Sequence, residues 1–168
     1  MLNLTVFCTL LFSGAAAADS APADSDIVVK ATTTASAADA YVWLQDLGNH
    51  RMAWPQDCAR RWEMGEPMVG LGATAETSYR AGAWRRRLVM EITKLNPDKR
   101  VDLEHQGKKG FTTTWTLTPV DAGTEVELHT WINPPPWPFY KTYFKKTQPK
   151  WTVCHQAAVD AAAGKMAN

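Results

Sequence analysis

The sequence predicts an α+β domain in which a seven-stranded curved antiparallel sheet wraps around a long C-terminal helix, with one or two short helices between the first two strands. Between residues 90 and 132, four segments alternate apolar and polar residues, and the short turns NPDK, QGKKG and VDAG separate them. This alternation is typical of half-buried antiparallel strands. Helical spacing of apolar residues occurs both before and after this region, so helices are expected to cover one face of the sheet.

The individual elements follow from local patterns. Ser36 and Asp39 resemble a capping box, the apolar residues behind them predict a helix to Leu47, and Gly48 is the expected stop. A short helical turn over 49–53 is a further expectation. A final helix is predicted from about 137 to 166, with a kink at Pro149. The seven strands are predicted at 27–33, 60–65, 73–80, 84–94, 100–105, 111–119 and 124–132.

The 168-residue chain has the length of one domain. Residues 1–18 carry no charged side chain and run from an apolar stretch into small residues, which predicts a signal peptide and a periplasmic or secreted protein. The apolar stretch is too short for a membrane span. Residues 19–26 are expected to be a flexible lead-in, and 27–166 the domain. The net charge of +1 gives no support to nucleic-acid binding.

Two cysteines, Cys58 and Cys154, remain once the leader is removed. An even number of cysteines in an oxidising compartment predicts a disulfide bond between them. Two unpaired buried thiols are the alternative, and they would be expected if the leader were not an export signal.

Four motifs, in this order, carry a resemblance to a known family: SAADAYVWLQDLGNHRMAWP, VGLGA, MEITKLNPDKRVDLEH and TWTLTPVDAGTEVEL. Together they resemble the START-like (SRPBCC) superfamily, and within it the polyketide cyclase/dehydrase and lipid-transport proteins with a helix-grip fold. The resemblance covers roughly residues 27–163. It implies a small hydrophobic or lipid-like ligand held between sheet and helix, although this scaffold carries many unrelated functions.

Alternation also predicts which side chains face the space between sheet and helix. Apolar walls with few polar groups suit a pocket for a small hydrophobic molecule. The alternative is that the same side chains pack against the helix as a dry core. The expected ligand-binding residues are Tyr79, Leu88, Met90, Leu103, His105, Thr113, Trp115, Leu128 and Thr130 from the strands, with Tyr140 and Phe144 from the final helix.

His105 is the only histidine that the alternation directs inward, so His105 and Tyr79 are the best candidates for catalysis. No carboxylate is predicted on the same face, and the alternative is a structural histidine or one at the rim of the site. His50, His129 and His155 are expected on a loop, an outward strand face and the final helix. The sequence has no metal-ligand spacing and no cofactor motif, so no metal or cofactor is expected.

Two surface features stay open. Trp54 and Trp137 are expected at loop edges, where they could form a portal, touch a membrane interface or simply anchor loops. The cluster Arg85, Arg86 and Arg87 and the lysines of the final helix are expected to be a solvated face, with weak attraction to anionic lipid headgroups as the alternative. A monomer is expected.

Three functions remain after these arguments. The first is an exported domain that binds a small hydrophobic or lipid-like molecule. The second is an enzyme of the polyketide cyclase/dehydrase or aromatase kind. The third is an envelope interaction module without a ligand.

Overall fold

The computed structural model describes residues 26–81, 84–107, 110–132 and 140–168, and only the backbone of residue 84 and of residues 140–144. The predicted signal peptide, nearly all of the lead-in and Trp137 lie outside the described residues. In the described part of the chain, none of the helices combines the length and hydrophobicity that crossing a membrane requires.

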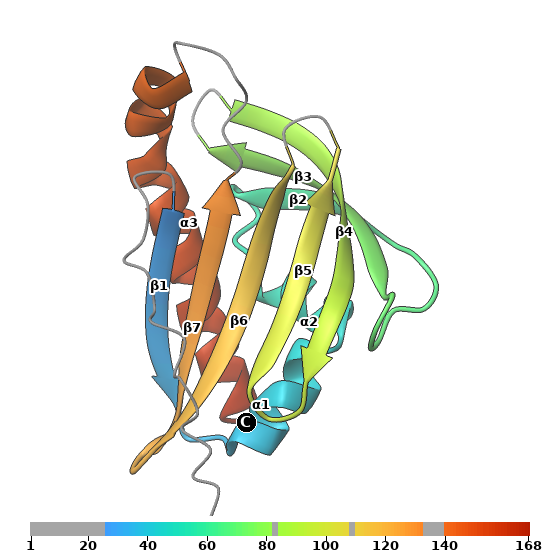
Figure 1. The fold of residues 1–168 in the computed structure, drawn as a ribbon, viewed down its shortest axis with the longest axis vertical. Helices are drawn as coiled ribbons and strands as arrows, with labels where there is room; N and C mark the ends of the chain where they lie inside the picture. Colours follow the sequence, from blue (N-terminus) through green and yellow to red (C-terminus); the bar gives the residue numbers. More distant parts are fainter. Residues whose placement is uncertain (1–25, 82–83, 108–109, 133–139) are drawn as a thin grey trace, which may run out of the picture.

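The predicted fold class is confirmed. A single curved antiparallel sheet has the strand order β1-β7-β6-β5-β4-β3-β2, and the three helices lie behind it in the view of Figure 1. Within the alternating region, the turns at 97–99 and 121–122 are short, as predicted. The elements are β1 (Asp26–Thr33), α1 (Ala37–Leu44), α2 (Leu47–Ala53), β2 (Ala59–Met64), β3 (Thr74–Ala81), β4 (Trp84–Asn96), β5 (Arg100–Gln106), β6 (Phe111–Val120), β7 (Gly123–Ile132) and α3 (Tyr140–Met166).

The two short helices between β1 and β2 are confirmed, but their predicted boundary is wrong: the first helix does not reach Leu47, and the helical turn expected at 49–53 begins already at Leu47. Ser36 caps α1 as expected, and its hydroxyl accepts a hydrogen bond from the Asp39 amide at 3.1 Å. The helix ends at Leu44, however, and Asp46 starts α2 by accepting a hydrogen bond from the Gly48 amide at 2.7 Å. Gly48 therefore lies inside a helix and does not end one. The apolar spacing continues through Leu44 and Leu47, but the N-cap residue Asp46 ends the first helix and starts a second one.

The core lies between the inner face of the sheet and one face of α3. Buried residues recur along α3 at helical spacing, so one side of the helix packs on the sheet. Pro149 is exposed within this helix, and the predicted kink stays a prediction. The buried residues of α3 are Thr147, Trp151, Cys154, His155, Ala158, Val159, Ala162, Ala163 and Met166.

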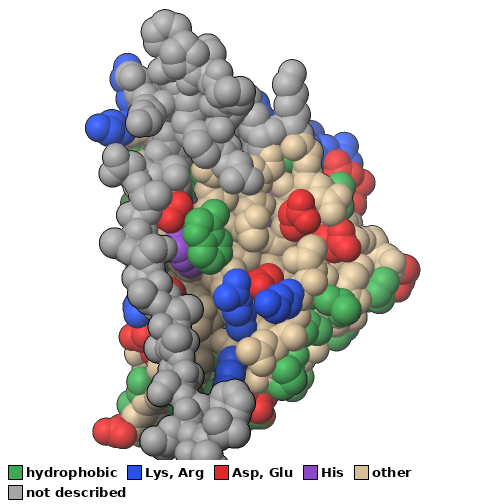
Figure 2. Space-filling view, in the orientation of Figure 1, with side chains coloured by type: hydrophobic (Ala, Val, Ile, Leu, Met, Phe, Trp, Pro, Cys, Tyr) green, Lys and Arg blue, Asp and Glu red, His purple; other side chains and the backbone are tan. Residues whose placement is uncertain are grey.

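The outer face of the sheet carries mixed charges, and hydrophobic side chains are scattered over it singly (Figure 2). Asp102 alternates with the inward residues of β5 and so points to this face, where it is nevertheless buried. Its carboxylate accepts hydrogen bonds from Arg100 and Thr114, each at 2.7 Å. These partners offset the cost of burying the carboxylate.

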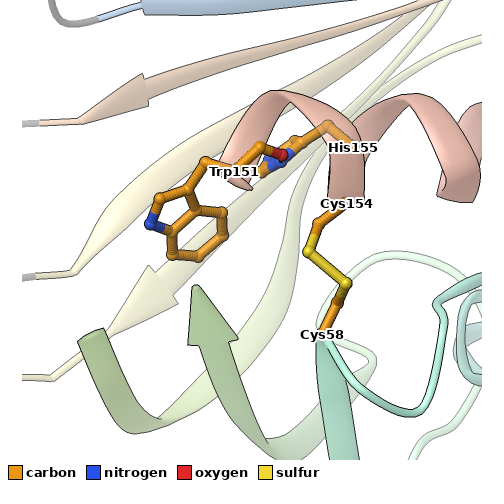
Figure 3. The surroundings of a disulfide bond; sticks show 4 residues. All are labelled: Cys58, Trp151, Cys154 and His155. Atoms are coloured by element: carbon orange, nitrogen blue, oxygen red, sulfur yellow. A yellow bond between two sulfur atoms is a disulfide. The ribbon is translucent and has the colours of Figure 1, made fainter. Parts of the chain in front are cut away.

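The predicted disulfide is confirmed. Cys58 lies just before β2 and Cys154 lies on α3, and their Cα atoms are 5.8 Å apart. In Figure 3, Cys154 points away from the helix toward Cys58, while Trp151 projects from the same helix toward the strands. The bond thus ties the second strand to the helix that covers the sheet.

Candidate functional site

A band of polar side chains crosses the inner face of the sheet at the level of Tyr79. Met90 pairs with His105 across β4 and β5, and Thr113 pairs with Thr130 across β6 and β7. His105 Nε2 lies 3.0 Å from the hydroxyl of Thr113, and the Tyr79 hydroxyl donates to Met90 Sδ at 3.8 Å. All five side chains are buried. The register of the sheet therefore brings together the four predicted polar side chains, which come from β3, β5, β6 and β7, with Met90 of β4 between them.

Apolar side chains surround this band. Leu88, Leu103, Trp115 and Leu128 are buried on the same inner face, as the alternation predicts. The side chains of Tyr140 and Phe144, the two ligand-binding residues predicted on the final helix, lie outside the described residues.

One alternative and one prediction about the histidines are wrong. His105 is fully buried, with 2% of its surface exposed, which excludes the alternative of a histidine at the rim and leaves that of a structural histidine. It is also not the only inward histidine, because His50 on α2 and His155 on α3 are buried as well. The sequence did contain a signal for His155, which follows Trp151 by four residues and so continues the buried stripe of α3.

Aromatic rings fill the part of the interior next to this band. His105 stacks on Phe111 with ring centroids 4.0 Å apart, and the Tyr79 ring lies edge-on to both, at 5.4 Å and 5.5 Å. Trp151 and His155 approach from α3, where Trp151 lies 5.6 Å from Phe111. The described interior at this end is therefore closely packed.

Trp54 belongs to the same cluster, which excludes a portal or membrane-interface position for this residue and leaves the loop-anchoring alternative. Only 5% of its surface is exposed. Its ring lies 5.5 Å from that of Tyr79 and 5.0 Å from that of His155. The turn at the end of α2 points this ring inward, which the neighbouring proline in the sequence could not reveal.

Three buried polar atoms lack a hydrogen-bond partner among the described residues. They are His105 Nδ1, Thr130 Oγ1 and His155 Nε2. Buried polar groups are nearly always satisfied in folded proteins, and leaving one unsatisfied costs about 1–3 kcal/mol. These atoms come from β5, β7 and α3, so they face the interior from both the sheet and the helix.

Burial controls the protonation of the histidines. Loss of solvation is the main cause that lowers the pKa of His155 from 6.5 to about 4. It also lowers the pKa of His50, and it lowers that of His105 well below its usual value, with repulsion from the other two histidines adding to the effect. All three rings are therefore neutral at neutral pH. Burial raises the pKa of Tyr79, so its hydroxyl stays protonated.

This arrangement offers neutral hydrogen-bond donors and acceptors, not charges. The described residues give His105 no carboxylate partner that would raise its basicity. They also include no group of three or more histidine, cysteine, aspartate or glutamate residues placed to hold a metal ion. Such a surface suits an uncharged molecule with one or a few polar groups.

The fold and the apolar inner face define a helix-grip domain of the START-like (SRPBCC) type. The family model described as "Polyketide cyclase / dehydrase and lipid transport" matches residues 25–153. The chain therefore belongs to this family. Among curated proteins, none is similar enough to match the chain.

Solved structures share the fold at low sequence identity. The KanY protein is 14% identical with a TM-score of 0.72, covering 85% of this chain and 97% of its own. TTHA0849 from Thermus thermophilus is also 14% identical, with a TM-score of 0.69 and coverage of 84% and 96%. The di-domain ARO/CYC StfQ from the steffimycin biosynthetic pathway is 18% identical with a TM-score of 0.63, covering 83% of this chain and 50% of its own.

Proposed function

We propose that this protein is exported and binds a small hydrophobic or lipid-like molecule between the sheet and α3. The observation that carries the proposal is the set of unsatisfied buried atoms on His105, Thr130 and His155, which lie in an apolar interior. A molecule with an apolar body and a hydroxyl or carbonyl group would satisfy them without burying a charge. The disulfide is compatible with an oxidising compartment, and this supports export.

The aromatic cluster determines how binding should be detected. Because rings pack against one another beside the unsatisfied atoms, a bound molecule must separate some of these rings. Trp54, Trp115 and Trp151 are buried in or near this region. Binding should therefore change the intrinsic tryptophan fluorescence as well as the mass of the complex.

The first experiment is native mass spectrometry of the protein purified from the organism that makes it. An added mass that disappears on denaturation supports the proposal and identifies the ligand. Protein freed of ligand is then titrated with two uncharged probes, 1-hexadecanol and 1-hydroxyanthraquinone, which represent lipid-like and aromatic ligands, and tryptophan fluorescence is followed. If no mass is added and neither probe binds, the proposal fails and the ligand-free interaction module remains.

A matched pair of variants tests the place of binding. Thr130→Val removes only the inward hydroxyl, and the loss of one hydrogen bond should weaken binding by about fivefold. Thr116→Val makes the same change on the outer face of the neighbouring strand, where Thr116 is half-buried, and should leave binding unchanged. Equal effects of the two variants would exclude the interior as the binding site.

One observation favours the cyclase alternative. His105 and Tyr79 have ring centroids 5.4 Å apart, and His105 Nδ1 has no partner among the described residues. A neutral imidazole could accept a proton there while the protonated tyrosine donates one. Once a substrate has been identified, the His105→Phe variant should bind it but should not convert it. Turnover that survives in this variant would remove His105 from the reaction.

A further inference from the structure

One end of the sheet concentrates most of the arginines of this chain. The sequence contains eight arginines. Six of them, Arg60, Arg61, Arg80, Arg85, Arg86 and Arg87, line a single surface pocket of about 320 Å³. The chain as a whole has a net charge of only +1, so six arginines around one pocket form a local concentration of positive charge.

The register of β2, β3 and β4 builds the pocket. Ser78 pairs with Arg60 on one side and with Arg87 on the other, so its short side chain lies between two long ones. Arg80 pairs with Arg85 in the next outward row. Side chains on one face of adjacent strands lie about 5 Å apart. The small serine thus leaves a hollow that four guanidinium groups surround.

A bulge adds a fifth guanidinium group. The pairing of β2 with β3 is irregular between Arg60 and Glu63, and Arg61 has a φ of 58°. Left-handed backbone is uncommon for a residue with a side chain, and such positions cluster at functional sites. The irregularity allows Arg60 and Arg61, which are consecutive in the sequence, to line the same pocket.

The carboxylates of this region neutralise only part of the charge. Arg87 on β4 forms ion pairs with Glu76 on the neighbouring strand β3 and with Glu63 on β2, one strand further along the sheet. Among the described residues, Arg60, Arg61, Arg80 and Arg85 have no ion-pair partner. Like charges that face each other across strands destabilise a sheet. A bound anion would offset that repulsion.

We propose that this pocket binds a phosphate group. A guanidinium group can donate two parallel N–H hydrogen bonds to two oxygens of one phosphate group. Several guanidinium groups around one pocket therefore match a multivalent anion better than they match a single carboxylate. The pocket has the size of a small-ligand site and not of an extended nucleic-acid groove. The phosphate group can belong to a small phosphorylated molecule or to a lipid headgroup. This site lies on the outer face of the sheet and does not depend on the proposed interior ligand.

The test compares two double variants with the same change in charge. Arg80→Gln/Arg85→Gln removes two arginines without ion pairs and leaves Arg87 with its glutamates. Lys145→Gln/Lys146→Gln removes two exposed lysines from α3. Each protein is titrated with inorganic phosphate and with glycerol 3-phosphate by calorimetry at constant ionic strength. Each is also mixed with phosphatidylcholine vesicles with and without phosphatidate, and binding is measured by sedimentation.

The native protein should bind at least one of these phosphate probes, and the arginine variant should lose affinity at least tenfold. The lysine variant should change by less than twofold. In phosphate-free buffer the arginine variant should also melt at a higher temperature than the native protein, because repulsion is relieved. This gain would show that it still folds.

Binding of the soluble probes indicates a small phosphorylated ligand, whereas binding of phosphatidate vesicles alone indicates a headgroup. Both results support the proposal. It is overturned if no phosphate probe binds, or if the two double variants lose affinity equally, since general charge attraction would then suffice.

Discussion

Acid should destabilise this protein through its buried histidines, and His155 allows the effect to be calculated. The Trp151 carbonyl can only accept a hydrogen bond, so His155 Nδ1, 2.8 Å away, must carry the proton and donate it. The other ring nitrogen, Nε2, is buried without a partner among the described residues. Protonating the ring would therefore place a charge where no described residue stabilises it.

The sign and the size follow from the lowered pKa. Between pH 6.5 and about 4, the unfolded chain binds a proton at His155 and the folded protein does not. The free energy of unfolding therefore falls as the pH falls through this window, by about 1.4 kcal/mol per pH unit and about 3 kcal/mol in total. Above pH 6.5 this contribution to stability is fully present. His50 and His105, whose pKa values are also lowered, should make the fall steeper.

The assay is urea denaturation followed by tryptophan fluorescence at pH 7.5, 6.5, 5.5 and 4.5. His155→Phe keeps a ring at this position and removes the titrating group, so its slope between pH 6.5 and 4.5 should be smaller by about 1.4 kcal/mol per pH unit. Val153→Phe places the same ring on the exposed side of α3 and should keep the native slope. Identical slopes for His155→Phe and the native protein would show that His155 is not buried as a neutral ring.

Three further changes test the framework, each by denaturant unfolding. Replacing Cys58 and Cys154 by serine opens a loop spanning 96 residues and should lower the free energy of unfolding by about 4–5 kcal/mol; an unchanged value would mean that the bond does not constrain the unfolded chain. Ser36→Ala removes the α1 cap and should cost about 1 kcal/mol, and no loss would contradict the capping role. Gly123→Ala should cost about 2–4 kcal/mol, because φ is +134° and the new methyl group would overlap the end of β1. Gly164→Ala, in an open position on α3, should instead stabilise the protein by about 0.5–1 kcal/mol, and equal effects of the two glycine changes would refute the steric argument.

The strands could be predicted because their alternation is local. The predicted strand at 111–119 corresponds to β6 (Phe111–Val120), and that at 124–132 corresponds to β7 (Gly123–Ile132). In these strands every second side chain must reach the core, so the sequence itself records the inward face. The boundary between the first two helices was harder to predict, because the apolar spacing continues past Asp46, where the N-cap of the second helix lies.

The candidate site was predicted only in part. Alternation placed Tyr79, His105 and Thr130 on the inner face, and all three are buried there. His155 and Trp54 were missed because their direction depends on how α3 and the end of α2 pack against the sheet. The partners of each polar atom depend on the same packing, so no pattern along the chain could show which atoms would lack one.

The sequence by itself determined the fold class and the inward face of the strands, since these depend on periodicity, and its cysteine count predicted the pairing of Cys58 with Cys154. Only the tertiary structure decided which polar groups meet in the interior and that six arginines surround one pocket. Residues brought together by strand register and helix docking are far apart in the chain, and their mutual distances, burial and charge balance exist only once the chain has folded.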